Sequence, residues 1–257
     1  MTPVSRTAII LVGGQGARLR PFTEAVPKPM LPIGARPILE INIEYLKAFG
    51  FNEIVLATGY MKDYITHYFG NGEKLEVRIR YSEDKTPLGT GGAVKQAGKG
   101  VKGPFVVVLG DGLADIDYRA LLQYHKESKA VGTLVVFERR LQIPYGVLKM
   151  DVGHENAILA LEEKPELTFS VNTGIIVLEP EALSYMAEGE YLRMPDLILR
   201  VKEHGKKAIA YQHRGNWIDI GQNVEQYLAI NRDILEGKIT FNNTLTSIIL
   251  GGNQGGA

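Results

Sequence analysis

Short apolar segments rich in β-branched residues alternate with segments of helical periodicity, and this alternation restricts the fold more than any other feature. Apolar runs cover residues 8–12, 53–58 and 105–109, with a shorter alternating strand at 77–81. Helices are predicted over 37–49, 61–69, from about 91, and over 118–129. Continuous apolar strands separated by helices are typical of a parallel sheet with both faces covered. We therefore expect an α/β fold with a Rossmann-like, mostly parallel central sheet flanked by helices, and ligands beyond the carboxyl ends of the strands.

The second half of the chain is richer in strands. Closely spaced strands are predicted over 132–137, 146–150, 158–163 and 171–178, which indicates a strand-rich lobe. Helices follow over 179–186, 194–203 and 222–236, with strands at 208–213 and 217–220. We expect a single domain over residues 1–240, divided at about residue 130, and a short C-terminal tail over 241–257 whose glycine-rich end has no apolar anchor.

Composition excludes several classes of function. Lysine plus arginine (29) equals aspartate plus glutamate (29), which removes the bulk electrostatic argument for a nucleic-acid or membrane partner. No cysteine occurs, so disulfides and thiolate chemistry are excluded. The apolar run near the N-terminus is too short for a signal segment or a spanning helix. We expect a cytoplasmic protein; the sequence leaves homo-oligomerisation open.

A glycine-rich segment follows the first strand. Gly13, Gly14 and Gly16 allow backbone N–H groups to approach a ligand closely, which suits phosphate. Arg18, Arg20 and Lys28 stand beside them and indicate more than one phosphate. The dinucleotide motif is disfavoured because Leu19 replaces its third glycine and prolines 21, 27 and 29 interrupt the helix, and the Walker pattern is absent. The competing interpretation is a strand-exit turn with solvated basic residues.

Residues 13–19, Gly-Gly-Gln-Gly-Ala-Arg-Leu, and the later Pro27-Lys28-Pro29 resemble the first motif of the sugar nucleotidylyltransferases. Ala17 departs from the family's usual threonine. The resemblance implies that residues 7–130 bind nucleotide and residues 131–240 bind sugar phosphate. It also implies that Arg18 and Lys28 hold the triphosphate, and that the nucleotide contacts include Leu11, Gly13, Gly14, Gln15 and Gly16.

A second glycine-rich stretch, Pro-Leu-Gly-Thr-Gly-Gly at 87–92, precedes a predicted helix. By resemblance, Gly89 and Thr90 contact the nucleobase. The alternative from the residues alone is a helix-entry turn capped by Thr90.

Two aspartates follow apolar strands that are distant in sequence. Asp111 follows residues 105–109, and Asp219 lies between two isoleucines. A carboxylate at such a position needs a cation or several donors, and two carboxylates suffice for Mg²⁺ when substrate phosphates supply other ligands. The family has two such metal ligands, so we expect Mg²⁺ at Asp111 and Asp219, with Asp111 also catalytic. Asp115 and Asp117 are interpreted as loop and helix-capping residues.

Three further segments match the sugar-phosphate side of the family. The resemblance assigns sugar contacts to Tyr145, Gly146 and Asn172, sugar-hydroxyl binding to Glu163, and binding of the sugar phosphate to Lys164. Taken alone, a Glu-Glu-Lys run is typical of a solvated face. The five histidines, which show no metal-binding spacing, are interpreted as helix-surface or turn residues: His67, His125, His154, His204 and His213.

The expected reaction is attack of a sugar 1-phosphate oxygen on the α-phosphorus of a nucleoside triphosphate, with release of pyrophosphate. Residues 217–235 look most like enzymes that transfer a guanylyl group to mannose or heptose 1-phosphate, whereas Gly110-Asp111-Gly112 is similar to cytidylyltransferases acting on glucose 1-phosphate. Cytidylyl, thymidylyl or uridylyl transfer to glucose 1-phosphate is the alternative, and a catalytically silent nucleotide-sugar sensor is an alternative of another class. An oxidoreductase is disfavoured by the prolines, and acetyl transfer by the lack of a hexapeptide-repeat segment.

Overall fold

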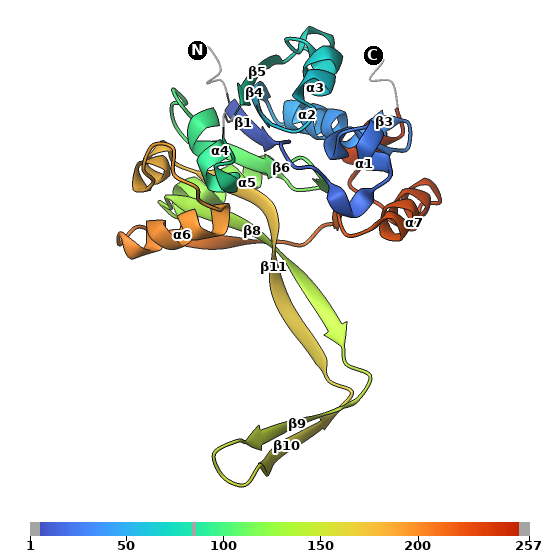
Figure 1. Cartoon of the computed structure of the whole chain (residues 1–257), viewed down its shortest axis with the longest axis vertical. Helices are drawn as coiled ribbons and strands as arrows, with labels where there is room; N and C mark the ends of the chain where they lie inside the picture. The colour runs from blue at the N-terminus through green and yellow to red at the C-terminus, as the bar shows by residue number, and fades with distance from the viewer. Residues whose placement is uncertain (1–5, 84–85, 252–257) are drawn as a thin grey trace.

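The computed structural model describes residues 6–83 and 86–251. The expected N-terminal start over residues 1–5 and most of the glycine-rich end, 252–257, lie outside the described residues. The central sheet has the strand order β12-β8-β11-β6-β1-β4-β5 (Figure 1). Its strands are β1 (Arg6–Leu11), β4 (Phe51–Thr58), β5 (Arg78–Glu83), β6 (Phe105–Leu109), β8 (Gly132–Gln142), β11 (Glu166–Leu178) and β12 (Ala208–His213).

The prediction of a mostly parallel sheet is confirmed. Each of the pairs β1/β4, β1/β6, β4/β5 and β12/β8 is parallel. Only β11 runs antiparallel to its two neighbours, β6 and β8. The carboxyl ends of β1, β4 and β6 therefore meet at one edge of the sheet.

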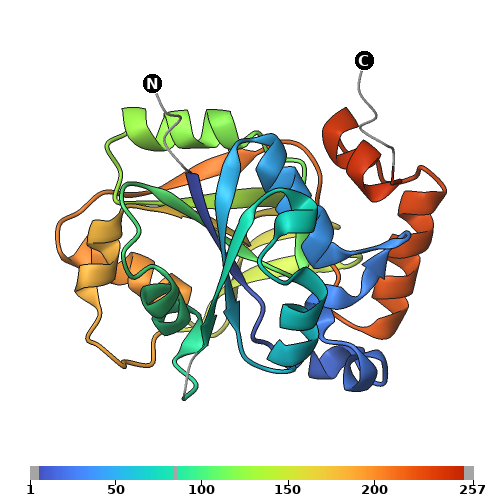
Figure 2. The ribbon, with the colours of Figure 1, turned by 90° about the horizontal axis from the view of Figure 1, so that it is seen from above.

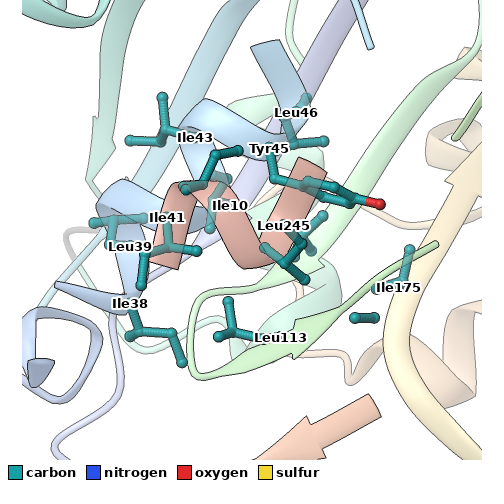
Figure 3. Close-up of a cluster of buried hydrophobic side chains, with 14 of the residues drawn as sticks. Ile10, Ile38, Leu39, Ile41, Ile43, Tyr45, Leu46, Leu113, Ile175 and Leu245 are labelled. Carbon is teal, nitrogen blue, oxygen red and sulfur yellow. The ribbon is translucent and has the colours of Figure 1, made fainter. Parts of the chain in front are cut away.

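Helices cover both faces of this sheet, as Figure 2 shows from above. Neighbouring residues of β1 demonstrate the two layers, since Ile9 belongs to one apolar cluster and Ile10 to another. Figure 3 shows the larger cluster, in which Ile10 lies near apolar side chains of α2. The helices are α1 (Phe22–Ala25), α2 (Ile38–Ala48), α3 (Lys62–Phe69), α4 (Gly89–Ala97), α5 (Tyr118–Glu127), α6 (Met194–Glu203), α7 (Val224–Leu235) and α8 (Asn243–Ile249).

Helix α8 was not expected, since residues 241–257 were interpreted as a tail. Leu245 is fully buried and lies near apolar side chains of α2 (Figure 3). Ile249 is 1% exposed and belongs to the same apolar cluster. The Arg36 guanidinium also connects α2 with α8. It donates hydrogen bonds to Glu40 and Glu44 of α2 and to the carbonyl of Ile248 in α8. Residues 243–249 are thus a packed element of the domain. The predicted helix over 179–186 is instead a 3-10 helix, Pro180–Tyr185.

The strand-rich part forms a long arm. Beyond the sheet, β8 and β11 continue as a two-stranded ribbon that projects from the body and leads to the hairpin β9 (Gly146–Asp151) and β10 (Ala157–Glu163) (Figure 1). Two short pairs complete the strands: β2 (Pro32–Ile33) with β3 (Arg36–Pro37), and β7 (Gly112–Ala114) with β13 (Trp217–Asp219). In the described part of the chain, no helix is long and apolar enough to span a membrane.

Candidate active site

The site begins where β1 and β6 end side by side. Leu11 is the register partner of Leu109, and the backbone N–H of Gly110 donates to the carbonyl of Leu11 (3.0 Å). This parallel pairing places the glycine loop and Asp111 next to one another at the carboxyl edge of the sheet. The position is the one that open α/β sheets use for ligands.

A cleft of about 550 Å³ opens at this edge. Its lining combines both glycine-rich segments, and includes Leu11, Gly13, Gly14, Gln15, Gly89 and Thr90. Gly89 has φ +70°, and a side chain there would bring Cβ within 2.6 Å of the carbonyl of Leu192. A β-carbon is therefore excluded at Gly89 by both conformation and space.

Gly16 does not line the cleft, but it shapes the loop. It has φ +63°, and an added Cβ would meet Thr23 Cγ2 at 2.9 Å and Lys28 Cβ at 3.0 Å. The Thr23 hydroxyl donates to the Gly16 carbonyl at 2.9 Å. The loop thus folds back onto the turn that carries Lys28. The expected absence of a long helix is confirmed, since Lys28 sits in a three-residue 3-10 helix after the four-residue α1.

A second cavity, of about 480 Å³, adjoins the first. The two cavities share Lys28, Leu109 and Asp111 in their linings. The second also contains Arg18, Asn172 and Asp219. Lys28 and Asp111 therefore stand at the boundary between a glycine-lined cleft and a more polar one.

Asp111 and Asp219 come together through the pairing of β7 with β13. Asp219 is the register partner of Gly112, and the backbone N–H of Ile220 donates to the Asp111 carbonyl (3.3 Å). One Asp219 oxygen accepts from the backbone N–H of Gly221 (2.7 Å), and the other from the side-chain amide of Gln222 (3.0 Å). Two carboxylates separated by more than a hundred residues thus line one cavity.

The ammonium group of Lys28 contacts Asp111, and the backbone of Gly221 lies close to both Lys28 and Asp219. The ammonium group forms an ion pair and hydrogen bond with Asp111 Oδ2. A Cβ added at Gly221 would lie 2.0 Å from Lys28 Nζ and 2.8 Å from Asp219 Oδ1. Lys28 is 9% exposed, so its charge is compensated by contacts within the protein.

This donor set fits Mg²⁺. The described residues contain no group of three or more His, Cys, Asp or Glu side chains arranged to hold a metal. Mg²⁺ is usually held by one or two carboxylates together with substrate phosphates and water. Asp111 and Asp219 would supply two hard oxygen ligands, and both line the second cavity.

Sequence reasoning missed several residues of the second cavity. Arg139, Trp217, Gln222 and Gln226 also line it. The Arg139 guanidinium lies over the rings of Phe137 and Trp217, at 5.3 and 5.4 Å from their centroids. The sequence pattern did not identify Arg139, because the predicted strand ended at residue 137, whereas β8 continues to Gln142.

Four of the residues expected to bind sugar phosphate lie on the arm. Tyr145, Gly146, Glu163 and Lys164 come together at the junction of the ribbon and the hairpin, where the Lys164 N–H donates to the Tyr145 carbonyl (3.2 Å). None of these residues lines either cavity. Only Asn172, at the base of the arm, lines the second cavity. The structure therefore divides the predicted set between the two ends of the ribbon.

Other local expectations had mixed outcomes. Asp117 caps α5, as expected, by accepting from the N–H groups of Arg119 and Ala120. The capping alternative for Thr90 is wrong, because Thr90 lies inside α4 and its hydroxyl accepts from the Met194 N–H (2.9 Å). The surface interpretation is also wrong for His125 and His213, which are 0% and 6% exposed.

Comparisons with known proteins bear on the family of the chain. The profile of a family described as "Nucleotidyl transferase" matches residues 7–237. The chain is 32% identical to UTP–glucose-1-phosphate uridylyltransferase from Synechocystis, with 90% of this chain and 64% of the relative covered. It is 31% identical to mannose-1-phosphate guanyltransferase from Saccharomyces cerevisiae, with 92% and 65% covered. The chain thus spans about two thirds of the length of these two relatives.

A shorter relative matches over nearly its whole length. It is D-glycero-alpha-D-manno-heptose 1-phosphate guanylyltransferase from Campylobacter jejuni, 36% identical, with 86% of this chain and 96% of the relative covered. Among solved structures, HddC from Yersinia pseudotuberculosis has a TM-score of 0.68 at 26% identity, with 89% and 99% of the two chains covered. A glucose-1-phosphate thymidylyltransferase from Bacillus anthracis, itself described as putative, has a TM-score of 0.70 at 24% identity, with 94% and 99% covered, and supports the fold. With a family match across residues 7–237, the chain belongs to the nucleotidyl transferase family.

Proposed function

We propose that this chain joins a nucleoside triphosphate to a sugar 1-phosphate, giving a nucleotide sugar and pyrophosphate. The observation that carries the proposal is the position of Lys28, on the boundary of two adjoining cavities and beside Asp111. A base and a triphosphate fit the glycine-lined cleft, and a second anion fits the cavity that also contains Arg18 and Asn172.

The chemistry needs no nucleophile from the protein. The sugar phosphate is already ionised, so the task is to bring two polyanions together and neutralise the leaving pyrophosphate. Two unit charges about 4 Å apart repel by roughly 4 kcal/mol at an effective dielectric of 20. Lys28 supplies positive charge where the two cavities meet, and Arg18 supplies it within the second cavity. Asn172 supplies a polar contact for the acceptor.

We further propose that Asp111 and Asp219 hold Mg²⁺. The bound ion would neutralise phosphate charge and orient the triphosphate. With Asp111 bound to the metal, a substrate phosphate would take its place as the partner of Lys28.

The substrate pair that we infer is GTP with mannose or heptose 1-phosphate. Two of the relatives described above are named as guanylyl transferring enzymes for these sugars, and the heptose enzyme is covered over 96% of its length. Uridylyl transfer to glucose 1-phosphate is the second candidate, because the Synechocystis relative is named for that reaction.

The test is pyrophosphate release from purified protein with each common triphosphate paired with several sugar 1-phosphates, and identification of the product by mass. Asp111→Asn is expected to lower Mg²⁺-dependent turnover by about 10²–10³-fold, the scale at which loss of one charge-stabilising group acts. The matched control is Asp117→Asn, which changes an exposed helix cap outside both cavities and retains turnover.

Two outcomes reject parts of the proposal. Binding of a nucleotide sugar without turnover of any substrate pair would identify a silent sensor. Near-normal turnover of Asp111→Asn in magnesium would remove Asp111 from the metal site.

A further inference from the structure

The second cavity contains two cationic side chains without an acidic partner among the described residues. Its charged lining consists of Arg18, Lys28, Asp111, Arg139 and Asp219. Lys28 is paired with Asp111. Asp219 accepts hydrogen bonds from a backbone N–H and from a side-chain amide. Arg18 and Arg139 therefore remain available to an anion that enters the cavity.

Arg139 differs from its neighbour Arg140, although both are exposed residues of β8. Arg140 forms ion pairs with Glu138 and Glu166. Arg139 lies over aromatic rings instead, and the alternation of side chains along a strand places it on the opposite face. Within the part of the chain that the structure describes, the charge of Arg140 is therefore compensated and that of Arg139 is not.

Two aromatic rings hold the Arg139 side chain. Phe137 and Trp217 pack together with their ring centroids 5.9 Å apart, and the guanidinium lies over both. Aromatic rings attract a cation by their π faces but supply no oxygen acceptor. The N–H donors of the guanidinium thus remain free for a stronger acceptor, and their planar fork matches the oxygens of a phosphate group. This arrangement prepares Arg139 to bind phosphate.

Arg139 lies on the acceptor side of the site. It lines the second cavity but not the glycine-lined cleft. Its strand pairs directly with β11, which carries Asn172, another residue of the cavity wall. Arg18, by contrast, follows the glycine loop, which the proposed function assigns to the triphosphate. Of the two unpaired cations, Arg139 is thus the one that belongs to the wall of the acceptor.

We propose that Arg139 binds the phosphate group of the sugar 1-phosphate and sets the affinity of the site for this substrate. This inference rests on the proposed function for the identity of the substrate. A guanidinium already held by two rings loses little conformational freedom when phosphate binds, so the contact is favourable even at an exposed position. Because Arg139 does not line the triphosphate cleft, its loss weakens the binding of one substrate and not of the other.

Steady-state kinetics tests this selectivity with the sugar 1-phosphate that the wild type turns over. Arg139→Met keeps an apolar side chain against the two rings but removes the charge. We expect KM for the sugar 1-phosphate to rise by about 10–10²-fold, the scale of a lost hydrogen bond to a charged group. KM for the triphosphate should stay nearly unchanged. The matched control is Arg140→Met, one residue away, which should leave both KM values unchanged.

A second readout does not depend on turnover. Trp217 is the only tryptophan of the chain and lines the same cavity, so its fluorescence reports an anion that binds there. Inorganic phosphate serves as the probe, with sodium chloride of equal ionic strength as the blank. We expect a saturable change in the wild type and in Arg140→Met. The dissociation constant should be about 10–10²-fold higher in Arg139→Met.

The outcomes separate this inference from the proposed function. Wild-type protein without turnover of any substrate pair removes the proposed function, and the phosphate titration still decides whether Arg139 binds an anion. An active Arg139→Met with the wild-type KM for the sugar 1-phosphate, or with the wild-type affinity for phosphate, overturns the inference. An equal rise in both KM values, or an equal effect of Arg140→Met, overturns the assignment of Arg139 to the acceptor.

Discussion

Substitution of Asp115, a loop residue with a buried carboxylate, is expected to lower the free energy of unfolding strongly. Its carboxylate is 9% exposed and accepts from the backbone N–H groups of Asn216 (2.7 Å) and Asn242 (3.0 Å). It also lies 3.2 Å from His213 Nε2. The Asp115 side chain therefore holds two segments in place by hydrogen bonds: the one that leads into β13, and the start of α8. Strand β13 carries Asp219.

Asp115→Ala leaves two backbone donors without this acceptor. Hydrogen bonds to a charged group contribute about 1.5–3 kcal/mol each. Because the contacts share one carboxylate, we expect a loss of about 3–5 kcal/mol in the free energy of unfolding, or roughly 10 °C in Tm for a chain of this size. Urea denaturation followed by circular dichroism measures the change.

The effect depends on pH in a defined direction. Burial raises the pKa of the Asp115 carboxyl, but hydrogen bonds from His213 and from the backbone of Asn216 and Asn242 outweigh it and hold the pKa below its ordinary value. A folded pKa below the unfolded value contributes stability above about pH 4, and this contribution is lost as pH falls through the folded value. The difference between wild type and Asp115→Ala should therefore be full at pH 7 and shrink below about pH 4.

The matched control is Asp117→Ala. Its carboxylate also accepts from two backbone N–H groups, at 2.8 and 3.1 Å, but at an exposed helix cap. Loss of such a cap costs about 1 kcal/mol. If Asp115→Ala costs no more than Asp117→Ala, or if its cost is independent of pH, the reasoning is refuted.

Three further substitutions test the site and its supports. Gly221→Ala places Cβ 2.0 Å from Lys28 Nζ and therefore displaces the lysine. We expect turnover to fall by about 10²-fold with little change in Tm. Unchanged turnover would remove Lys28 from the mechanism. Gly174 has φ +80°, and the Cβ of Gly174→Ala would lie 2.3 Å from Leu109 Cδ1. We expect the free energy of unfolding in urea to fall by about 2–4 kcal/mol. No change would contradict the close packing of β11 against β6. Arg36→Ala loses the hydrogen bonds to Glu40, Glu44 and the Ile248 carbonyl, and should lower the free energy of unfolding by about 1–3 kcal/mol. The control Arg20→Ala, at an exposed ion pair, should change it very little. Equal changes would show that α8 does not depend on Arg36.

Where local chemistry decides an element, the sequence located it well. Strand β6, helix α6 and strand β12 have the predicted bounds, because polar or turn-forming residues enclose each one. The glycine loop and Asp111 also lie where ligands were expected, beyond the carboxyl ends of parallel strands.

Other features depend on contacts that no local pattern reveals. Helix α8 has a polar start, Asn-Thr, and gains its stability from packing against α2, so it resembled a tail. The outer part of β8, Glu-Arg-Arg-Leu-Gln, has too little apolar alternation to be recognised as a strand. Its pairing with β11 determines that the ribbon projects, and with it the separation of Lys164 from Asn172.

The pairing of β7 with β13 has a consequence for how the domain is made. During synthesis, the glycine loop and Asp111 emerge early, but their cavity lacks a wall until residues 217–219 have left the ribosome and found β7. Contacts of such long sequence separation form late and slowly. An unfinished chain therefore lacks Asp219 beside Lys28 and Asp111, and the proposed affinity for metal-bound triphosphate would arise as one of the last events of folding.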